Sequence, residues 1–409
     1  MMRSSCFNIL FSTDDTYAVW NSLSDRVLVL SEREYLALLH GRAETIEMSR
    51  RQLLQQEGVL VDEPDEMGEF IDQRHADRQL RSLYFRVLTT TACNARCAYC
   101  YEQGFPVSSM DENTAVSVAQ FIAQQYSEHP LGAKVTVEWF GGEPSLNPDA
   151  IQTITEWLHR EEVPFQTHMT SNGILITEQL ISKVSAWNLR RIQITLDAAD
   201  QAYETIKQVP PGSFDQVLEN IDLCLSSDIR VVVRINYAGD RNRVKNLIEK
   251  LAARYSERAV KPQMYISPIY GAQKSIPSDI MREVMELNGL LVEANLRTFE
   301  EVYSLRQRDR CFCATPWGFT IMPDGTLVNC SHNVSAQNTC GTIWNFTPVN
   351  EMHQKFLSNN LQEACYTCPL MPICGGGCPA AQYGVAQMNL CIPYRNVITD
   401  ILRARLKTV

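Results

Sequence analysis

Three cysteines stand close together in the first third of the chain, in the stretch CNARCAYC at residues 93–100. Cys93, Cys97 and Cys100 follow the spacing C-x3-C-x2-C, directly after an apolar segment. Three thiolates from one loop cannot complete the tetrahedral shell of zinc without a fourth ligand. They can instead bind three irons of a 4Fe–4S cluster and leave the fourth iron open to a substrate or cofactor. This loop therefore predicts an iron–sulfur centre with an open coordination position.

A second group of cysteines fills the C-terminal part of the chain, where nine of the 14 cysteines lie between Cys311 and Cys391. A run with the spacing C-x2-C-x5-C-x3-C covers residues 365–378, and a Gly-Gly-Gly stretch inside it permits tight loops. Disulfides suit small secreted domains, and zinc sites usually combine cysteine pairs with further pairs or with histidines. Because only 7 histidines occur, none of them at zinc-finger spacing, the pattern favours iron–sulfur clusters.

The overall composition is that of an acidic globular protein: of 409 residues, 45% are hydrophobic and 21% are charged. Lys and Arg number 37 against 47 Asp and Glu, and this net charge of −10 disfavours nucleic-acid binding through a basic face. The apolar runs are too short to cross a bilayer, and the first residues show no secretory signal. We therefore expect a cytoplasmic protein with reduced thiols and with neither a nucleic-acid nor a membrane partner.

Alternating strand and helix patterns between residues 82 and 300 must position the first cysteine loop. Amphipathic helical segments such as 177–187 and 215–226 separate the apolar strands. Such an α/β alternation predicts a parallel sheet with right-handed crossovers, either an open doubly wound sheet or a barrel. The six expected strands are Tyr84–Thr90, Lys134–Phe140, Phe165–Thr170, Arg191–Leu196, Arg230–Asn236 and Gln263–Ser267.

Residues 1–75 have the pattern of a separate small module. A strand is expected at residues 7–11, and a hairpin is expected across residues 17–30. Ser31 and Glu34 have the spacing of a capping box, which predicts that a helix starts there. This order of strands and helices fits a winged-helix-like module.

Two segments lack regular periodicity. The acidic residues 62–66 are expected to form a linker after the N-terminal module. Residues 305–409 combine cysteines, glycines and short apolar runs, so we expect metal sites to organise this third domain.

The cysteine loop and three motifs at the ends of later strands together resemble the radical S-adenosylmethionine (radical SAM) superfamily. A GGEP turn covers residues 141–144, Ser-Asn-Gly covers 171–173, and Thr195 ends the fourth strand. The resemblance implies a partial (β/α)6 TIM-like barrel in which the first-loop cysteines hold a 4Fe–4S cluster and its open iron binds SAM. The SAM contacts that it implies are Tyr99, Gly141, Gly142, Glu143, Ser171, Asn172 and Thr195.

The same resemblance implies the class of reaction. One electron from the reduced cluster cleaves SAM to a 5′-deoxyadenosyl radical, and this radical abstracts hydrogen from a substrate carbon. We therefore expect a radical SAM oxidoreductase that draws its electron from a flavodoxin- or ferredoxin-type reductant. A non-catalytic Fe–S electron carrier or scaffold is the alternative from another class, but it has no need of the GGEP and Ser-Asn-Gly motifs.

The C-terminal cysteines resemble the SPASM extension, which holds two auxiliary 4Fe–4S clusters in other members of the superfamily. The resemblance assigns the second auxiliary cluster to Cys365, Cys368, Cys374 and Cys391. It assigns the first auxiliary cluster to Cys313, Cys330 and Cys378, with either Cys311 or Cys340 as the fourth ligand. If neither of these two binds, one iron of that cluster stays open to substrate.

A winged-helix-like module joined to both cysteine groups resembles the SPASM maturases of ribosomally synthesised and post-translationally modified peptides (RiPPs). This implies a precursor peptide whose leader the module binds, and a thioether or carbon–carbon crosslink as the product. The alternative is an anaerobic sulfatase-maturing, formylglycine-forming enzyme, which uses an aspartate directly after the cysteine that matches Cys330. That position is Ser331 here, which is a poor base at neutral pH, and the adjacent His332 is the candidate base instead.

Overall fold

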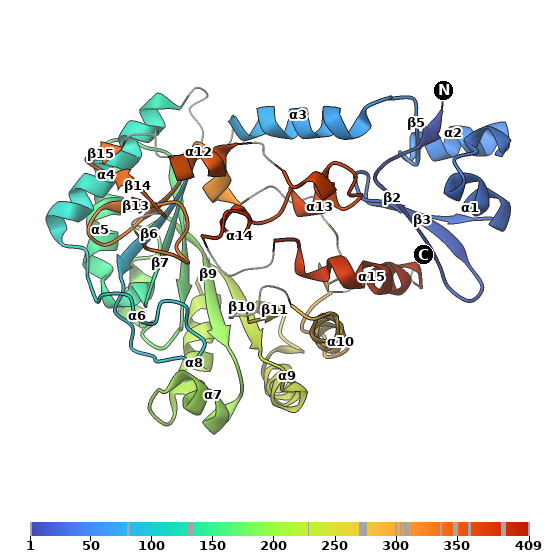
Figure 1. Cartoon of the computed structure of the whole chain (residues 1–409). Coiled ribbons are helices and arrows are strands. Elements are labelled where there is room, and N and C mark those ends of the chain that lie inside the picture. Colours follow the sequence, from blue (N-terminus) through green and yellow to red (C-terminus); the bar gives the residue numbers. More distant parts are fainter. Residues whose placement is uncertain are drawn as a thin grey trace.

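The computed structural model contains one large sheet surrounded by helices and a small N-terminal sheet at one end (Figure 1). Within the described part of the chain, no helix is both long enough and apolar enough to span a membrane. The expected barrel end at residue 300 and the chain end at residue 409 lie outside the described residues, and the division into three domains stays a prediction. The structure describes residues 2–79, 82–129, 134–227, 229–269, 276–298, 301–302, 305, 311–335, 338–346, 351–358, 361–385 and 390–407.

Six parallel strands form the centre of the large sheet, and their bounds differ from the expected ones by two residues at most. The strands are β6 (Tyr84–Thr90), β7 (Val135–Gly141), β8 (Phe165–Ser171), β9 (Leu189–Leu196), β10 (Arg230–Tyr237) and β11 (Gln263–Pro268). The helices between and after them are α4 (Glu112–Glu128), α5 (Pro148–Arg160), α6 (Glu178–Ser182), α7 (Asp200–Lys207), α8 (Ser213–Leu225), α9 (Arg241–Tyr255) and α10 (Ser278–Glu293). The helix expected at residues 177–187 is shorter than predicted, because turns follow α6 and Asn188 takes a left-handed conformation before β9.

The order of the strands decides between the two sheet types that the sequence left open. The strands lie in the order β11-β10-β9-β8-β7-β6, so each one neighbours the next in the chain without a reversal. Right-handed crossovers that all run in one direction place their helices on one face of the sheet, whereas a doubly wound sheet reverses its order and has helices on both faces. The arrangement is therefore that of an open barrel with its helices outside (Figure 1).

The two faces of these strands differ in chemistry. On β10, Val231, Val233 and Ile235 are buried in the apolar core that the strands share with the helices. Arg234 and Asn236 alternate with them and therefore lie on the opposite face, toward the barrel interior. The interior of this barrel is thus lined by polar and charged side chains.

The N-terminal part is a three-stranded antiparallel sheet of β2 (Asn8–Ser12), β3 (Tyr17–Asn21) and β4 (Arg26–Leu30). It is followed by α1 (Glu32–Leu39), a 3-10 turn (Ala43–Thr45) and α2 (Met48–Gln56), while β1 (Arg3–Ser4) pairs with β5 (Leu60–Val61). The expected hairpin and capping box are confirmed, since the Glu34 amide donates to Ser31 Oγ and the Ser31 amide donates to Glu34 Oε2. A winged helix in the strict sense stays a prediction.

A helix that the sequence analysis did not predict follows this module. The expected acidic linker is wrong at its last residue, because Glu66 already begins α3 (Glu66–Gln79). Met67 and Ile71 on this helix bury their side chains against Phe7 and Met371. This burial stabilises the helix despite its many charged residues, because packing of an apolar face outweighs intrinsic preference.

The C-terminal part continues the large sheet, although its sequence has little periodicity. β12 (Gly318–Ile321) pairs in parallel with β6, and β13 (Thr326–Val328), β14 (Thr339–Thr342) and β15 (Asn345–Phe346) follow in antiparallel order. Pairing with the edge of β6 therefore helps to organise this part of the chain, for which the sequence predicts metal sites alone. The remaining elements are η3 (Phe312–Ala314), α12 (Glu351–Leu357), η5 (Glu363–Cys365), α13 (Met371–Cys374), α14 (Pro379–Gln382), η6 (Pro393–Val397) and α15 (Ile398–Leu406).

The last helix joins the two ends of the chain. α15 lies beside the N-terminal sheet (Figure 1), and Arg405 Nη1 forms an ion pair with Asp25 Oδ1 at 2.6 Å. Trp20 of β3 is fully buried in the same apolar core as Ile401 and Leu402 of α15. The N-terminal sheet is therefore packed against α15, the last helix of the chain.

Candidate active site

The first cysteine loop follows β6, and its three thiols face one another. Cys93, Cys97 and Cys100 are all partly buried and free of disulfides. Burial raises the pKa of the Cys93 and Cys100 thiols, and the neighbouring Cys97 raises both further. This mutual influence shows that the spacing brings the three sulfurs together at the C-terminal end of the barrel strands.

The glycines of the GGEP turn let the end of β7 approach the cysteine loop closely. A Cβ atom on Gly142 would lie 2.2 Å from the Ala92 carbonyl oxygen, and one on Gly141 would lie 2.2 Å from that of Thr90. The Gly142 amide donates to the Thr90 carbonyl at 3.0 Å, and the Glu143 amide donates to the Ala92 carbonyl at 2.9 Å. These glycines therefore fix the cysteine loop against β7, a role that the sequence did not reveal.

Glu143 connects the GGEP turn to the Ser-Asn-Gly motif after β8. Its fully buried carboxylate accepts hydrogen bonds from Ser171 Oγ at 2.9 Å and from the Asn172 amide at 2.7 Å. Burial raises the pKa of Glu143 against the opposing effect of these hydrogen bonds. Asn172 Nδ2 in turn donates to Asn94 Oδ1 at 2.7 Å and lies 3.9 Å from Cys93 Sγ. The two motifs are thus joined by hydrogen bonds beside the cysteine loop.

Tyr99, the aromatic residue of the cysteine loop, is held by side chains from three other elements. Its hydroxyl donates to Asp197 Oδ1 at 2.7 Å and accepts from Lys207 Nζ at 3.1 Å and Asn236 Nδ2 at 3.2 Å. Lys207 Nζ also donates to Thr195 Oγ1 at 2.9 Å. The ring position of Tyr99 is therefore fixed at once by Asp197, which directly follows β9, by α7 and by β10.

The ion pair under Tyr99 is almost completely buried. The side chains of Lys207 and Asp197 are each 2% exposed, and Lys207 Nζ lies 2.8 Å from Asp197 Oδ2. Burial alone would lower the pKa of Lys207, but the Asp197 carboxylate outweighs it and raises the pKa. The Lys207 carbonyl also accepts a hydrogen bond from the Arg96 amide at 2.8 Å. Lys207 therefore holds the cysteine loop through both its backbone and its side chain.

A cavity of about 780 Å³ opens beside this network. Tyr99, Asp197 and Asn236 form its polar wall, and Ile206, Ile269 and Ile280 are among its apolar residues. Its size and mixed lining suit an organic ligand that carries a few polar groups. The cysteine loop, the motif residues and this cavity lie together at one end of the barrel.

The C-terminal cysteines form two groups in space. In the first, Cys311 and Cys330 raise the pKa of the Cys313 thiol, and both also raise the pKa of the Cys378 thiol. Cys340 does not belong to this group: it is buried in the apolar core, and burial raises its pKa to about 12. Of the two alternatives for a fourth partner, the structure therefore places Cys311 with the others.

The second group gathers around the end of α13. Cys374 is influenced by Cys391, Cys365 and Cys368, and Arg395 Nη1 donates to Cys391 Sγ at 3.1 Å. The Gly-Gly-Gly stretch after Cys374 has positive φ at all three positions, a conformation that glycine adopts without strain. It turns the chain sharply between Cys374, which belongs to this group, and Cys378, which belongs to the other.

His332 lies between the first cysteine loop and the C-terminal cysteines. Its ring stacks on Tyr101 with centroids 4.0 Å apart, and its Nδ1 lies 3.8 Å from Cys330 Sγ. The preceding Ser331 is buried, and its hydroxyl accepts from Arg86 Nη1 at 3.2 Å. The candidate base is therefore next to a cysteine group and does not line the cavity at Tyr99.

The profile of the Radical SAM superfamily matches residues 87–253, from the middle of β6 to the end of α9. Residues 87–253 form a radical SAM domain. The curated relatives of this superfamily that match the chain are enzymes, among them a sulfatase-maturating enzyme and a GTP 3′,8-cyclase, so the chain is an enzyme.

Two curated relatives match beyond the cysteine loop. The serine-type anaerobic sulfatase-maturating enzyme of Klebsiella aerogenes is 24% identical over 347 residues, which cover 76% of this chain and 83% of the relative. A GTP 3′,8-cyclase of Clostridium perfringens (strain SM101 / Type A) is also 24% identical, over 271 residues that cover 61% of this chain and 80% of the relative. Both alignments extend beyond the radical SAM domain.

Solved structures are similar in fold at low sequence identity. The structure described as native anSMEcpe with bound AdoMet has a TM-score of 0.62 at 15% identity and covers 80% of this chain and 98% of its own. Streptococcus suis SuiB bound to the precursor peptide SuiA has a TM-score of 0.55 at 14% identity and covers 96% of this chain and 99% of its own. The radical SAM domain and its neighbouring segments therefore share the fold of these proteins.

The donors that the cysteine groups offer to a metal are all thiols. The thiolates of a 4Fe–4S cluster bind its separate irons. A thiol-only donor set of this kind fits the cluster of the radical SAM domain.

Several site residues carried no motif that the sequence analysis could detect. Lys207 and Asn236 lie in an ordinary helix and strand, and only folding brings them to Tyr99. Arg86 and Glu138 could have been noticed in the sequence as candidate site residues, because each is a charged residue inside an otherwise apolar strand. Their guanidinium and carboxylate pair between the neighbouring strands β6 and β7 at 2.8 Å.

Proposed function

We propose that this chain is a radical SAM maturase that acts on a ribosomally made precursor peptide and installs a thioether or carbon–carbon crosslink. The observation that carries the proposal is the combination of an N-terminal β-sheet module, a radical SAM barrel and two further cysteine groups in one chain. SuiB, which is described as bound to its precursor peptide, matches 96% of this chain, so the similarity includes the N-terminal module. A peptide substrate accounts for that module better than a small molecule does.

The cysteine groups define the proposed cofactor sites. Cys93, Cys97 and Cys100 would hold the cluster that binds SAM, and Tyr99 with the GGEP, Ser-Asn-Gly and Thr195 positions would surround the SAM molecule. The first auxiliary 4Fe–4S cluster would be held by Cys311, Cys313, Cys330 and Cys378. The second auxiliary 4Fe–4S cluster would be held by Cys365, Cys368, Cys374 and Cys391.

The chain's own residues would position these groups and keep water out. Bound SAM and its cluster supply hydrogen-atom abstraction from an unactivated carbon. The hydrogen bonds to Tyr99 and Glu143 fix the cysteine loop against β7, β8 and β9, which keeps the reacting atoms in register. An exchangeable proton on the substrate would pass to a base near the first auxiliary group, for which His332 stays the candidate.

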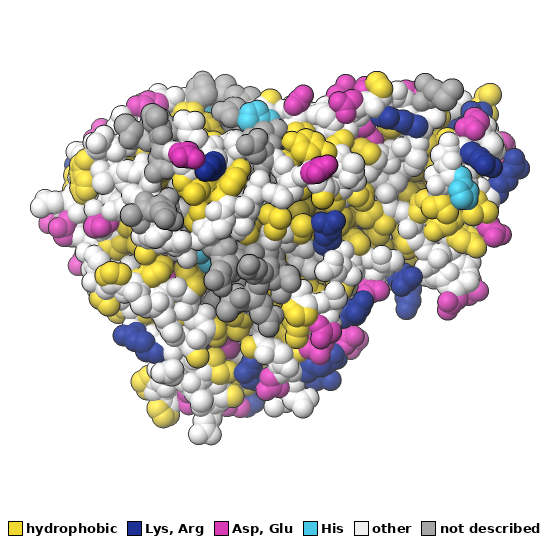
Figure 2. Space-filling model, viewed as in Figure 1, with side chains coloured by type: hydrophobic (Ala, Val, Ile, Leu, Met, Phe, Trp, Pro, Cys, Tyr) yellow, Lys and Arg dark blue, Asp and Glu magenta, His cyan; other side chains and the backbone are white. Residues whose placement is uncertain are grey.

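The N-terminal module offers a surface for a leader peptide. β4 is an edge strand of its sheet, and Val29 on it is 48% exposed. Leu36 and Leu39 on α1 are exposed as well, and Figure 2 shows hydrophobic side chains at the surface over this part of the module. An edge strand beside apolar side chains suits an extended peptide that adds as a further strand.

Sulfatase maturation is the second candidate, because the Klebsiella aerogenes enzyme matches 76% of this chain. Two observations favour the peptide maturase instead. The sulfatase-maturase fold covers 80% of this chain against 96% for SuiB. The residue after Cys330 is Ser331 and not the aspartate that the sulfatase-maturing enzyme uses as its base. The Ser331 hydroxyl accepts a hydrogen bond from Arg86.

The proposal is tested with the reconstituted chain, a flavodoxin- or ferredoxin-type reductant, and SAM. Formation of 5′-deoxyadenosine tests the radical chemistry, and co-expression with short peptides encoded beside the gene tests the substrate. Peptide mass spectrometry should show a loss of about 2 Da, the mass of two hydrogens, for a crosslink. A formylglycine in a sulfatase-derived peptide, with no change in the neighbouring peptides, would support the second candidate.

A further inference from the structure

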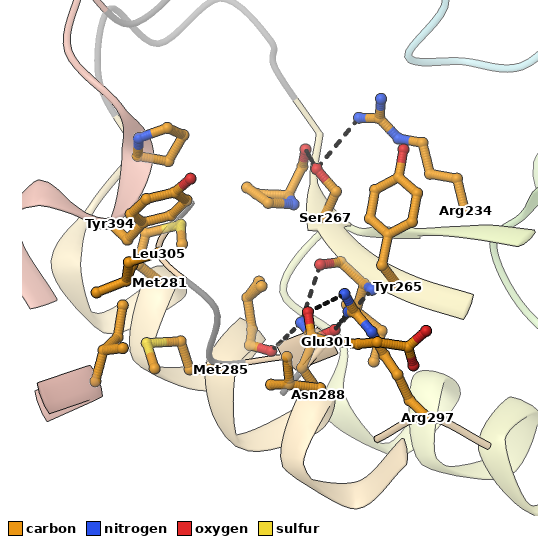
Figure 3. A pocket seen from close by; sticks show the side chains of 16 residues that line it. Arg234, Tyr265, Ser267, Met281, Met285, Asn288, Arg297, Glu301, Leu305 and Tyr394 are labelled. Atoms are coloured by element: carbon orange, nitrogen blue, oxygen red, sulfur yellow. Dashed lines mark hydrogen bonds between the residues drawn. The ribbon is translucent and has the colours of Figure 1, made fainter. Parts of the chain in front are cut away.

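A second cavity, of about 510 Å³, lies at the open edge of the barrel. It extends from β11 to α10 and to the C-terminal segment that holds Tyr394 and Ile401. Figure 3 shows an apolar wall with Met281, Met285 and Leu305, and a polar wall with Arg234, Tyr265 and Ser267. The cavity is therefore amphipathic, with its charge concentrated on the barrel side.

Arg234 provides a positive charge that no carboxylate of the described residues neutralises. Its Nε donates to Asn236 Oδ1 at 2.9 Å, and its Nη2 makes a long bond to Ser267 Oγ at 3.4 Å. A guanidinium has five N–H donors in a planar fork, so most of the donors of Arg234 remain for a ligand. Such a fork binds a carboxylate through two parallel hydrogen bonds.

The other charged side chains of the cavity, those of Arg297 and Glu301, are hydrogen-bonded to neighbouring polar and backbone groups. Arg297 Nη1 donates to Asn288 Oδ1 at 3.2 Å, and its Nη2 donates to the Glu301 carbonyl. The Glu301 carboxylate accepts from the Thr298 amide at 3.0 Å. These contacts close a turn after α10, which leaves Arg234 as the cation directed at a ligand.

A chain of hydrogen bonds connects Arg234 to the cysteine loop. Asn236 accepts from Arg234 through Oδ1 and donates through Nδ2 to the Tyr99 hydroxyl at 3.2 Å. Pro268 lines both this cavity and the larger one at Tyr99. A group bound at Arg234 would therefore lie next to the cavity in which the chemistry is expected.

The barrel interior holds further cations besides Arg234. Arg86 is paired with Glu138, but Nε of Arg191 is buried without a hydrogen-bond partner among the described residues. These cations lie inside a chain whose net charge is −10. Positive groups kept in the interior of an acidic protein indicate recognition of an anionic ligand there.

We propose that this cavity binds an acidic residue of the peptide substrate, with the side-chain carboxylate on Arg234 and Ser267. An apolar neighbour of that residue would lie on the wall of Met281, Met285 and Leu305. This inference rests on the proposed function, and it names the sequence feature that the enzyme selects: a Glu or Asp next to an apolar residue, close to the modified position.

The test uses the reconstituted holoenzyme and three synthetic probes, acetyl-Gly-Phe-Xaa-Phe-Gly-amide with Glu, Gln or Lys at Xaa. Isothermal titration should give the Glu peptide an affinity at least about tenfold above that of the Gln peptide, equivalent to about 1.4 kcal/mol. Arg234→Gln should abolish the difference. The matched control is Arg230→Gln on the same strand, since Arg230 is exposed and donates to Gln263 outside the cavity.

Each outcome bears on the proposal. Equal affinity for the Glu and Gln peptides, no binding of any probe, or a preference that survives Arg234→Gln would overturn it. Displacement of the Glu peptide by inorganic phosphate at lower concentration than by acetate would assign the cavity to a phosphate ligand and overturn it too. SAM cleavage without peptide reports on the radical SAM activity separately, and circular dichroism of each variant excludes misfolding.

Discussion

At the scale of single residues, the cysteines differ in environment more than in spacing. Cys311 and Cys340 are both close in sequence to the other C-terminal cysteines, yet only Cys311 influences the pKa of Cys313, whereas burial alone raises that of Cys340. Cys340 lies on β14 inside the apolar core. Environment therefore favours Cys311 for the proposed fourth ligand position, a choice that the sequence left open.

This difference predicts opposite results for two similar substitutions. Three 4Fe–4S clusters correspond to about 12 irons per chain. Cys340→Ala should retain about 12, because it removes only a buried apolar thiol, whereas Cys311→Ala should reduce the number toward about 8. Colorimetric iron analysis of both reconstituted variants measures this, with the exposed Cys6→Ala as the control. Loss of iron in Cys340→Ala alone would contradict the assignment.

The Arg86–Glu138 pair is a second residue-scale feature, and it predicts a pH-dependent stability. Burial alone would raise the pKa of Glu138, but Arg86 and the hydrogen bond from Tyr84 lower it overall. A lowered pKa in the folded state means that this stabilisation is present above the unfolded value of about 4.3 and is lost as the pH falls through the folded value. Glu138→Gln should destabilise the apoprotein by about 3–5 kcal/mol at pH 7, because it leaves a buried guanidinium unpaired.

Denaturant unfolding of wild type and Glu138→Gln measures this difference at several pH values. The gap in the free energy of unfolding should be largest near pH 7 and should narrow below about pH 4. The control is Glu128→Gln, which makes the same chemical change at the last residue of α4, where the side chain is exposed to solvent. A gap that stays constant with pH would refute the ionic origin of the effect.

At the scale of elements, the ends of neighbouring strands are locked to the cysteine loop by backbone contacts. Gly142 on the turn after β7 has no room for a side chain, because a Cβ would lie 2.2 Å from the Ala92 carbonyl oxygen. The position of the cysteine loop therefore depends on a residue that binds no metal itself.

Gly142→Ala should displace the cysteine loop and weaken the first cluster. We expect an incompletely reconstituted first cluster and at least about tenfold less 5′-deoxyadenosine, since small misplacements of reacting groups cost large factors in rate. Gly104→Ala is the matched control: Gly104 follows the same loop with no atom within 4 Å of its Cβ. Because Gly104 has a left-handed backbone conformation, alanine at this position should lower the free energy of unfolding by only about 1–2 kcal/mol. Equal cluster content in both variants, measured by electron paramagnetic resonance, would argue against this role.

At the scale of the whole molecule, the N-terminal sheet and the barrel form one packed unit. Trp20 shares the core of α15, and Ser22 Oγ donates to the Pro369 carbonyl in the second C-terminal cysteine group. The proposed leader site on β4 is separate from the cavities at the barrel. Peptide recognition and radical chemistry should therefore be separable by mutation.

Val29→Pro tests this separation. The Val29 carbonyl accepts from Arg50 Nη2 and so faces the free edge of β4, where proline would remove the amide that an added strand needs. We expect at least about tenfold weaker binding of a fluorescent precursor peptide and unchanged 5′-deoxyadenosine formation without peptide. Val27→Ala on the same strand serves as the control. Unchanged peptide affinity in Val29→Pro would exclude β4 as the leader site.

Much of the barrel could be derived from the sequence because its signals are local. The strand positions, the capping box of Ser31 and Glu34, and the cysteine spacings depend on residues close to one another in the chain. Helix α3 could not be derived in this way, because Met67 and Ile71 are stabilised by distant partners such as Phe7 and Met371. The extra strands β12–β15 depend in the same way on the free edge of β6.

The cysteine spacings that predicted the chemistry were determined by the sequence alone, since ligands within one loop are set by local geometry. Tertiary structure decided which distant residues complete the site. It brought Lys207 and Asn236 to Tyr99, Glu143 to Asn172, and Cys311 to Cys330. It also placed Arg234 at the wall of a cavity, where its guanidinium has no carboxylate partner among the described residues. Such contacts form only when the strands close into a barrel, because they join residues far apart in the chain.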